Sequence, residues 1–236
     1  MQKISVCIPT YNGEFYIKEQ LDSILYQLLP NDEIVISDDS STDQTLTVIK
    51  SLSEPRIKIF EGNKFRSPIY NIENAIRHSK GDIIVLADQD DVWLPDRLKE
   101  IIDGLQAADL VLTNAFVVDD KLNKYGNTLF ESLQTKKGFF ENLKKNTYVG
   151  CCMAFNTSLK KKILPFPSNL PMHDQWIGLI AELHCKINFI SKPSLLYRRH
   201  QLNASNTGSL SNNTIYTKLK YRMAMLSAII LHGFNR

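Results

Sequence analysis

The first half of the chain alternates between segments with strand character and segments with helical periodicity. Four short apolar runs have strand character: residues 3–10, 33–37, 56–60 and 82–87. Apolar residues recur at helical spacing between them, in residues 14–27, 45–52 and 68–80. Strands that alternate with helices build a parallel sheet whose two faces are covered by the helices. The sequence therefore predicts an α/β fold with a mostly parallel central sheet.

Polar residues follow three of these strands at the point where each strand ends. The three clusters are Thr10-Tyr11-Asn12, Asp38-Asp39 and Asp88-Gln89-Asp90-Asp91. In open α/β sheets, ligands bind beyond the carboxyl ends of the strands. Because neighbouring strands lie side by side, we expect the three clusters to meet at one edge of the sheet. This edge is the predicted binding site.

The second half of the chain is less regular. Strand character returns in residues 109–120, 147–156, 186–191 and 194–199, and helical character in residues 136–145 and 172–183. Residues 201–213 are polar and rich in Ser and Asn, and residues 214–234 have helical periodicity. We expect one domain over residues 1–200, with a nucleotide-binding half up to about residue 110 and a catalytic, acceptor-binding half from 111 to 200. Residues 201–236 are predicted to be a mobile linker followed by a C-terminal helix.

The composition argues against several classes of protein. The net charge of +3 over 236 residues gives no indication of nucleic-acid binding. The four cysteines lack the spacing of a zinc site, so we expect free thiols in a reducing compartment. No apolar stretch reaches the roughly 20 residues that span a bilayer, and the N-terminus has the pattern of a strand. These features predict a cytoplasmic protein.

The acidic cluster at residues 88–91 is crowded, and like charges at such short spacing repel one another. In an extended segment the side chains of Asp88 and Asp90 point the same way, because they are two residues apart. Two convergent carboxylates form an oxygen site for Mg²⁺ or Mn²⁺, with phosphate oxygens of a ligand completing the shell. Asp91 is interpreted as a cap for the next helix. The sequence thus predicts a divalent metal bound with a phosphorylated ligand.

Several motifs recur in an order typical of one enzyme family. They are PTYNGE, DDSSTD, ADQDDVW, VGCCMAFN, HDQW and YRRH, and they span residues 1 to about 200. The ensemble resembles the inverting family 2 glycosyltransferases with a GT-A fold, which has a Rossmann-like sheet. It is most similar to the bacterial enzymes that transfer rhamnose or hexoses during synthesis of surface polysaccharides. The resemblance implies transfer of a sugar from a UDP- or dTDP-sugar to a glycan or lipid-linked glycan.

The resemblance assigns binding residues one by one. Either Asp38 or Asp39 would hydrogen-bond the pyrimidine base, and Asp88 would meet the ribose or a metal-bound water. Asp90 and His200 would bind the metal, and the histidine favours Mn²⁺ over Mg²⁺. The remaining nucleotide-sugar-binding positions implied by the family are Pro9, Tyr11, Glu14, Gly150 and Arg198, with Arg198 or Arg199 assisting the metal at the diphosphate.

Asp174 occupies the position of the family's general base. An acceptor hydroxyl is a poor nucleophile until a positioned base takes its proton. Members of the family usually have an acidic residue just before this Asp, whereas this chain has His173. The departure casts doubt only on a role for position 173. A negative group at a helix start is also favoured by the helix dipole, which is compatible with the catalytic role.

Two other enzyme classes share features with this sequence. DQDDV fits the nucleophile motif of aspartate-based phosphatases, but that motif normally ends the first strand, and three strand-like segments precede it here. A sugar nucleotidyltransferase would carry a glycine-rich phosphate loop after the first strand, whereas PTYNGE has a single glycine. A non-enzymatic carbohydrate-binding protein would need neither Asp90 nor Asp174.

The C-terminal helical segment has an apolar face and basic residues. Such a helix can lie on a membrane surface, where lipid-linked acceptors are found. It can equally pack on the core or form a homodimer contact, and the sequence alone leaves these alternatives open. Peripheral contact with the inner face of the membrane is therefore one expectation among three.

Overall fold

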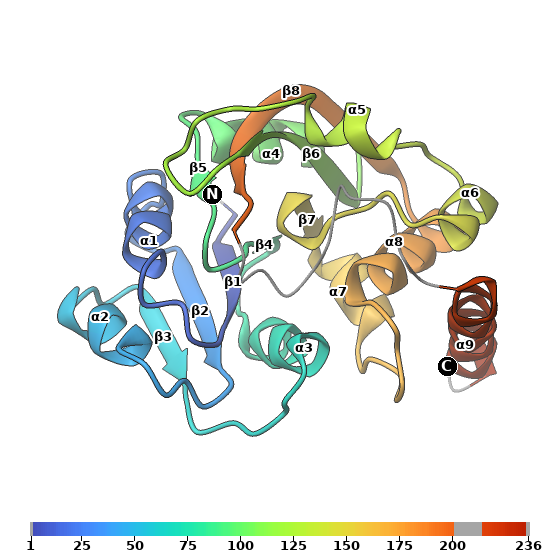
Figure 1. Ribbon diagram of the computed structural model, residues 1–236, viewed down its shortest axis with the longest axis horizontal. Helices are drawn as coiled ribbons and strands as arrows, with labels where there is room; N and C mark the ends of the chain where they lie inside the picture. The colour runs from blue at the N-terminus through green and yellow to red at the C-terminus, as the bar shows by residue number, and fades with distance from the viewer. Residues whose placement is uncertain (1, 201–213, 235–236) are drawn as a thin grey trace.

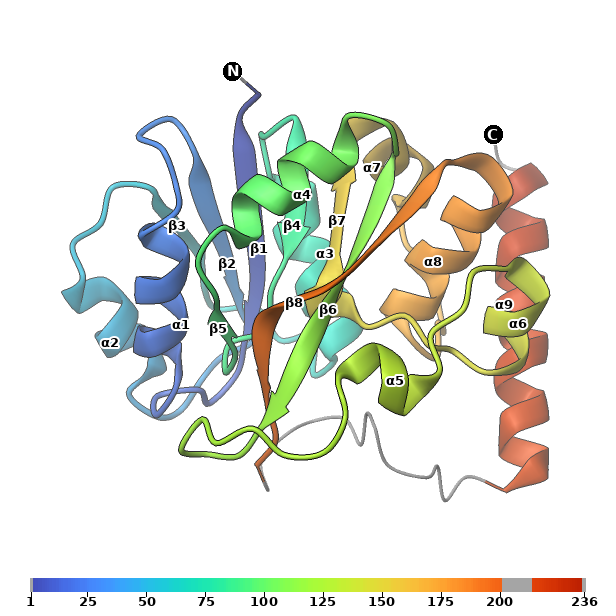
Figure 2. The ribbon, with the colours of Figure 1, turned by 90° about the horizontal axis from the view of Figure 1, so that it is seen from above.

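A computed structural model describes residues 2–200 and 214–234. Its centre is an eight-stranded sheet with the strand order β3-β2-β1-β4-β7-β6-β8-β5 (Figure 1). Helices cover both faces of this sheet, as Figure 2 shows from above. The expected mobile linker at residues 201–213 lies outside the described residues.

The first half of the chain forms the predicted parallel part of the sheet. Its strands are β1 (Ile4–Thr10), β2 (Glu33–Asp38), β3 (Ile57–Phe60) and β4 (Ile83–Leu86). All three pairings among them are parallel. The intervening helices are α1 (Ile17–Leu25), α2 (Thr45–Ser51) and α3 (Pro68–His78). Ser67 is the N-cap of α3 and Pro68 is its first residue. A proline is favourable there, because the first residues of a helix have no intrahelical partner for their N–H groups.

The second half adds strands of both directions. These are β5 (Val92–Trp93), β6 (Leu110–Val118), β7 (Met153–Asn156) and β8 (Ile187–Arg198). β7 pairs antiparallel with both β4 and β6, β5 pairs antiparallel with β8, and β6 and β8 are parallel. The two strands expected at residues 186–199 form the single strand β8, whose register shifts opposite Asn114. The sheet is therefore parallel in its first half and mixed in its second.

The remaining helices complete two layers around the sheet. They are α4 (Arg97–Leu105), α5 (Leu129–Leu133), α6 (Phe139–Lys144), α7 (Thr157–Ile163), α8 (His173–His184) and α9 (Ile215–Phe234). Helices α1, α2 and α4 pack in one apolar core, and α3, α7, α8 and α9 contribute to the other. Because successive strand residues point to opposite faces, Val6 enters the first core and Cys7 the second.

The state of the cysteines and the length of the helices bear on two expectations from composition. The four cysteines are free, and three of them are buried. Burial raises the pKa of the Cys7 thiol to about 12. Among the helices that the structure describes, none has the length and apolarity needed to cross a bilayer.

Candidate functional site

The carboxylate of Asp38 is buried at the end of β2 and is fully engaged by neighbouring groups. The Thr10 hydroxyl donates to it at 2.9 Å, and the Ser41 amide and hydroxyl donate at 2.9 and 2.6 Å. These contacts join the end of β1 to the loop after β2. Asp38 therefore has a structural role, because it holds the end of β1 and the loop after β2 together.

Asp39 is half-buried and faces the loop that precedes α3. Its two carboxylate oxygens accept hydrogen bonds from the backbone amides of Phe65, at 2.6 Å, and Ser67, at 3.2 Å. Each carboxylate oxygen can accept a further hydrogen bond. Of the two acids expected to meet the base, Asp39 is thus the one that remains partly open to a ligand.

The turn after β1 is fastened to the loop after β2 by side chains of both segments. The Glu14 carboxylate accepts from the Gln44 amide at 2.8 Å, and the Asn12 side chain accepts from the Thr42 amide at 2.8 Å. Tyr11 is 56% exposed, which leaves its ring available to a ligand. Pro9 is half-buried beside this turn. Asn12 has a φ of 50°, a conformation that Asn tolerates better than most residues.

Gln89 connects this turn to the acidic cluster, a role that the sequence analysis missed. Its side-chain oxygen accepts from the Tyr11 amide at 2.9 Å, and its side-chain nitrogen donates to the Tyr11 carbonyl at 3.0 Å. A Cβ on Gly13 would lie 2.5 Å from the Gln89 oxygen, so a glycine is required for this close approach. The turn after β1 and the acidic turn are therefore one connected unit.

Replacing Gln89 by Ala is expected to weaken nucleotide binding by up to about 30-fold. The change removes two hydrogen bonds, each contributing about 1 kcal/mol, that hold Tyr11 in place. Titration calorimetry with the nucleoside diphosphate measures the effect. Gln106→Ala, an exposed glutamine at the end of α4, is the matched control and should bind normally. Equal affinity of both variants would contradict this role of Gln89.

The acidic cluster is a turn, not the extended segment that the sequence analysis assumed. β4 ends at Leu86, and Gln89 and Asp90 lie in the turn that follows. The rule that side chains two residues apart in a strand point the same way therefore does not apply to Asp88 and Asp90. Ligand atoms of Asp88, Asp91 and Cys151 lie within 4.8 Å of one another. An Asp90 oxygen lies instead 2.9 Å from Nε2 of His200.

The expectation for Asp91 was wrong. Its side chain is fully buried and accepts a hydrogen bond from the Arg198 backbone amide at 3.0 Å, so it does not cap a helix. The other oxygen of Asp91 is buried without a hydrogen-bond partner among the described residues. Asp91 instead fixes the acidic turn to the end of β8.

The three carboxyl groups of this turn do not readily all carry a negative charge, because they are crowded and largely buried. Loss of hydration raises the pKa of Asp88 to about 7, and the negative charges of Asp90 and Asp174 add to this rise. Burial, followed by the charges of Asp90 and Asp88, also raises the pKa of Asp91 well above its usual range. A bound cation would relieve this repulsion. Asp90 and His200, whose side chains lie 2.9 Å apart, could supply an oxygen and a nitrogen ligand to such a cation.

Arg198 has a different place from the one expected. Its guanidinium donates to the Asp90 carbonyl at 2.7 Å, to the Asp120 carbonyl at 2.7 Å and to the Glu19 carboxylate. The residue is only 3% exposed. Because these neighbours occupy all three of its nitrogens, we reassign Arg198 from the diphosphate to the support of the acidic turn.

Tyr16 is a second site residue that the sequence analysis missed. Its ring stacks on the imidazole of His200 with a centroid distance of 4.5 Å. The Arg198 guanidinium lies over the same ring at 4.8 Å, and the Tyr16 hydroxyl donates to Asp120 at 3.2 Å. Tyr16 thus holds the imidazole beside Asp90. Nothing in the spacing of the sequence relates residue 16 to residue 200, so this contact could only come from the fold.

Asp174 lies in the first turn of α8, at the same edge of the sheet. It is half-buried, and loss of hydration raises the pKa of its carboxyl. Its negative charge adds to the raised pKa of Asp88. The preceding His173 packs on Gly150, where an added Cβ would lie 2.7 Å from its Nε2. In this structure Gly150 therefore makes room for His173.

The family model described as glycosyl transferase family 2 matches residues 5–164. The dTDP-rhamnosyl transferase RfbG of Shigella flexneri is 31% identical over 213 residues, which cover 82% of this chain and 72% of that protein. The Escherichia coli protein WfgD, a UDP-Glc:alpha-D-GlcNAc-diphosphoundecaprenol beta-1,3-glucosyltransferase, is 29% identical over 41% of this chain and 38% of its own length.

Solved structures show the same fold. Residues 1–349 of S. aureus TarS in complex with UDP-GlcNAc superpose with a TM-score of 0.71 and 22% identity, covering 95% of this chain and 66% of that one. The mannosyltransferase PcManGT from Pyrobaculum calidifontis, in complex with GDP-Man and Mn²⁺, has a TM-score of 0.60 and 19% identity, covering 100% of this chain and 65% of its own.

The curated relatives are longer than the region they share with this chain. The alignments span 34% of the glycosyltransferase alr2836 of Nostoc and 38% of WfgD. The family model nevertheless covers most of this chain, including both the β1–β2 edge and the acidic turn. The order of the motifs and the arrangement of the acids agree with it. The chain belongs to glycosyl transferase family 2.

Proposed function

We propose that this chain is a metal-dependent, inverting glycosyltransferase that acts in the synthesis of a bacterial surface polysaccharide. It moves a sugar from a UDP- or dTDP-sugar to a hydroxyl of a glycan or lipid-linked glycan. One observation carries the proposal: the segments that bear Asp39, Asp90 and Asp174 are joined at one edge of the sheet. Gln89 links the first two segments. His173, next to Asp174, packs on Gly150, and the adjacent Cys151 thiol lies within 4.8 Å of an Asp88 oxygen.

The residues of the acidic turn would hold the metal and the donor. Asp90 and His200 would bind Mn²⁺ or Mg²⁺, with Asp88 beside them. When bound, the metal neutralises the negative charge that develops on the departing nucleoside diphosphate. Tyr11, Glu14 and Pro9 would line the base and ribose pocket, where the Asp39 carboxylate accepts a hydrogen bond from the pyrimidine N–H.

Asp174 would act as the general base. The acceptor oxygen attacks the anomeric carbon while Asp174 takes its proton, and the bond from that carbon to the diphosphate oxygen breaks. Attack from the face opposite the leaving group inverts the configuration at the anomeric carbon. The half-buried position of Asp174 raises its pKa, and a more basic carboxylate is better suited to accept this proton.

The donor can be identified by thermal stabilisation. We expect UDP- or dTDP-sugars, in the presence of Mn²⁺, to raise the midpoint of unfolding, since a ligand that binds only the folded state stabilises it. RfbG is named for dTDP-rhamnose transfer, and TarS was crystallised with UDP-GlcNAc. Stabilisation by GDP-sugars alone would contradict the pyrimidine assignment, and stabilisation by no nucleotide-sugar would contradict the proposed function.

We infer a lipid-linked acceptor from the similarity to WfgD. WfgD is described as acting on a diphosphoundecaprenol-linked sugar. Lipid-linked acceptors lie at a membrane, so we place the reaction at the cytoplasmic face of one, where α9 is a candidate for peripheral contact. A homodimer through the same helix is the competing arrangement.

The phosphatase and nucleotidyltransferase alternatives lose support in the structure. Asp88 follows the fourth strand of the chain, whereas the phosphatase nucleophile ends the first. The turn after β1 is occupied by hydrogen bonds to the loop after β2, which leaves no glycine-rich phosphate loop there. Membership of glycosyl transferase family 2 supports neither alternative.

A further inference from the structure

Helix α9 exposes a continuous apolar strip along its outer face. The strip consists of residues spaced three and four apart, which places them on one side of a helix: Tyr216, Leu219, Met223, Leu226 and Ile230. Their exposed fractions range from 37% for Leu226 to 78% for Tyr216. An exposed apolar patch of this kind typically marks an interaction site.

The opposite face of α9 fastens the helix to the rest of the protein. Met225 and Ala228 are buried against the second core. The Arg222 guanidinium donates to the Lys144 carbonyl of α6 at 2.7 Å, and the His232 ring lies 2.6 Å from the Lys162 carbonyl at the end of α7. Because the opposite face of α9 packs on the rest of the protein, the apolar strip faces away from it.

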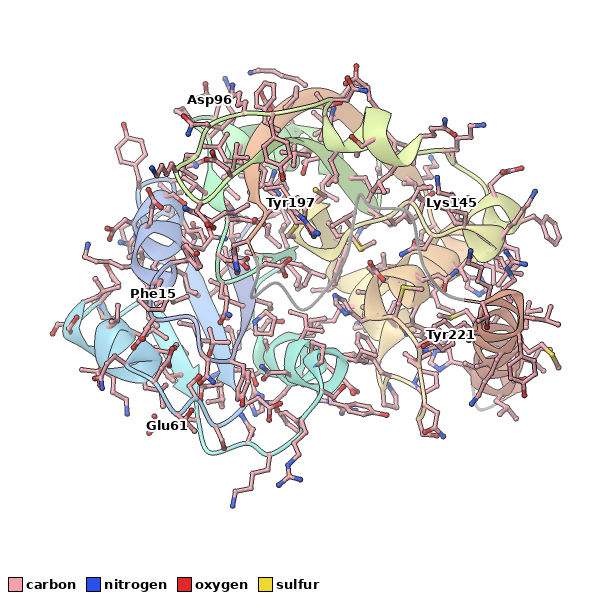
Figure 3. All side chains as sticks on the ribbon, in the orientation of Figure 1. Phe15, Glu61, Asp96, Lys145, Tyr197 and Tyr221 are labelled. Carbon is pink, nitrogen blue, oxygen red and sulfur yellow. The ribbon has the colours of Figure 1, made fainter. Side chains whose placement is uncertain are left out.

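The sequence segments that form this helix and its contacts on α6 and α7 are basic. Residues 134–163 contain seven lysines and one glutamate, and residues 201–236 contain four basic residues and no acid. These two stretches together carry +10, whereas the rest of the chain carries −7. Exposed basic residues on α9 are Lys218 and Lys220, and at the contacting end of α6 they are Lys144 and Lys145. Figure 3 shows Lys145 and Tyr221 on the side of the molecule occupied by α6 and α9.

The basic part of α9 also lies close to the end of the molecule that carries the site. In Figure 2 the N-terminal end of α9 lies at the same end of the molecule as the ends of β6 and β8. Lys218 and Lys220 belong to this first part of the helix. A surface that contacts the strip would therefore approach the catalytic edge from one side.

We propose that the outer face of α9 docks on an anionic lipid surface. An apolar strip flanked by Lys and Arg, on a helix without acids, has the pattern of helices that lie in the plane of a membrane interface. Anionic headgroups attract each nearby basic residue, and the apolar strip buries among the acyl chains. Pairing with a second copy of α9 would bring two strongly basic faces together, and the like charges would oppose it. The charge thus favours the membrane over a dimer.

This inference goes beyond sugar transfer, and its test uses neither donor nor acceptor. The full chain is sedimented with vesicles of pure phosphatidylcholine and with vesicles containing about a third of phosphatidylglycerol. We expect pelleting with the anionic vesicles only, weakened by added salt because salt screens the attraction. Pelleting that is equal with both vesicles, or absent with both, would overturn the proposal.

Two pairs of variants separate the contributions. Lys218→Glu with Lys220→Glu should lower vesicle binding at least about tenfold, because each basic residue near the surface contributes to attraction. Lys58→Glu with Lys99→Glu makes the same change in net charge on exposed residues of β3 and α4, and should bind nearly as well as the unmodified chain. Equal loss in both pairs would mean that only net charge matters, which contradicts a defined docking face.

Met223→Glu with Ile230→Glu tests the apolar strip itself. Both side chains are more than half exposed, so folding should survive, which the unfolding midpoint checks. Vesicle binding is expected to fall to background while the molecular mass in sedimentation equilibrium stays that of the unmodified chain. If the unmodified chain is a dimer that these changes convert to a monomer, the strip binds a second copy and the lipid assignment is wrong.

Discussion

Replacing Asp174 by Asn is expected to lower the rate of sugar transfer by about 10² to 10⁴-fold, the contribution typical of a general base. Asn is close to Asp in size and keeps a hydrogen-bonding oxygen, but it cannot take the proton of the acceptor hydroxyl. Donor affinity should change little, because the proposed donor contacts lie on the acidic turn and on the loops after β1 and β2. Single-turnover rates and titration with the donor measure the two effects separately.

The control for this change is Asp103→Asn, which makes the same replacement on an exposed residue of α4. It should transfer sugar at the normal rate. If Asp174→Asn also retains full turnover, Asp174 is not the base. A parallel loss of donor binding and rate would show instead that α8 shapes the donor site.

The pH dependence of the reaction follows from the same residue. Loss of hydration raises the pKa of Asp174 above its usual value near 3.8. The base acts in its deprotonated form, so kcat/KM should fall as the pH drops through this raised pKa. The acid limb should therefore lie at a higher pH than an ordinary aspartate would give. A profile flat down to the usual range of aspartate would contradict the assignment.

The second large effect is expected from Asp90→Ala. This change removes the carboxylate paired with His200 at 2.9 Å, and with it one of the two proposed protein ligands of the metal. Losing an outer-shell partner of a metal ligand already costs about 10- to 100-fold in affinity, so the loss of a ligand itself should cost at least about 100-fold. The nucleoside diphosphate should then bind equally weakly with and without Mn²⁺.

Calorimetry of nucleoside diphosphate binding, with and without Mn²⁺, measures this dependence. Asp103→Ala, with its exposed side chain, should keep the full metal dependence. His200→Ala should lower the dependence as Asp90→Ala does, since both side chains are proposed to bind the same ion. Metal-dependent binding that survives in Asp90→Ala would exclude Asp90 as a ligand.

The sequence was sufficient to predict the first half of the fold. Its strands are buried apolar runs separated by helices with clear periodicity, so local pattern and tertiary environment agree. The meeting of the Asp38-Asp39 and Asp88–Asp91 clusters at one edge follows from the parallel arrangement of β1, β2 and β4. Asp174 required the family resemblance, because a lone acid at a helix start has an ordinary structural explanation.

The details inside the acidic cluster could not be predicted, because they depend on a turn and on distant partners. Asp91 accepts from Arg198, and Tyr16 stacks on His200, across more than 100 residues of sequence. A two-residue alternation applies to strands and fails once Gln89 and Asp90 form a turn. Arg198 could not be distinguished from a ligand-binding arginine until its three partners were known.

The mixed half of the sheet has a similar explanation. Short strands such as β7 carry no sequence signal for direction, because parallel and antiparallel neighbours accept the same apolar residues when both faces are buried. β7 follows the turn at Gly150–Cys152 and pairs antiparallel with β4 and β6. This arrangement brings Cys151 beside Asp88 and Asp91.

Asp90 of the acidic turn and His200 after β8 are proposed to hold a metal together with the donor diphosphate. Anomalous scattering measured near the manganese absorption edge, on crystals grown with UDP or dTDP and Mn²⁺, tests this proposal most directly. We expect one peak that contacts Asp90, His200 and the diphosphate oxygens. A peak enclosed by Asp88, Asp91 and Cys151 without the diphosphate, or nucleotide bound with no metal peak, would contradict it.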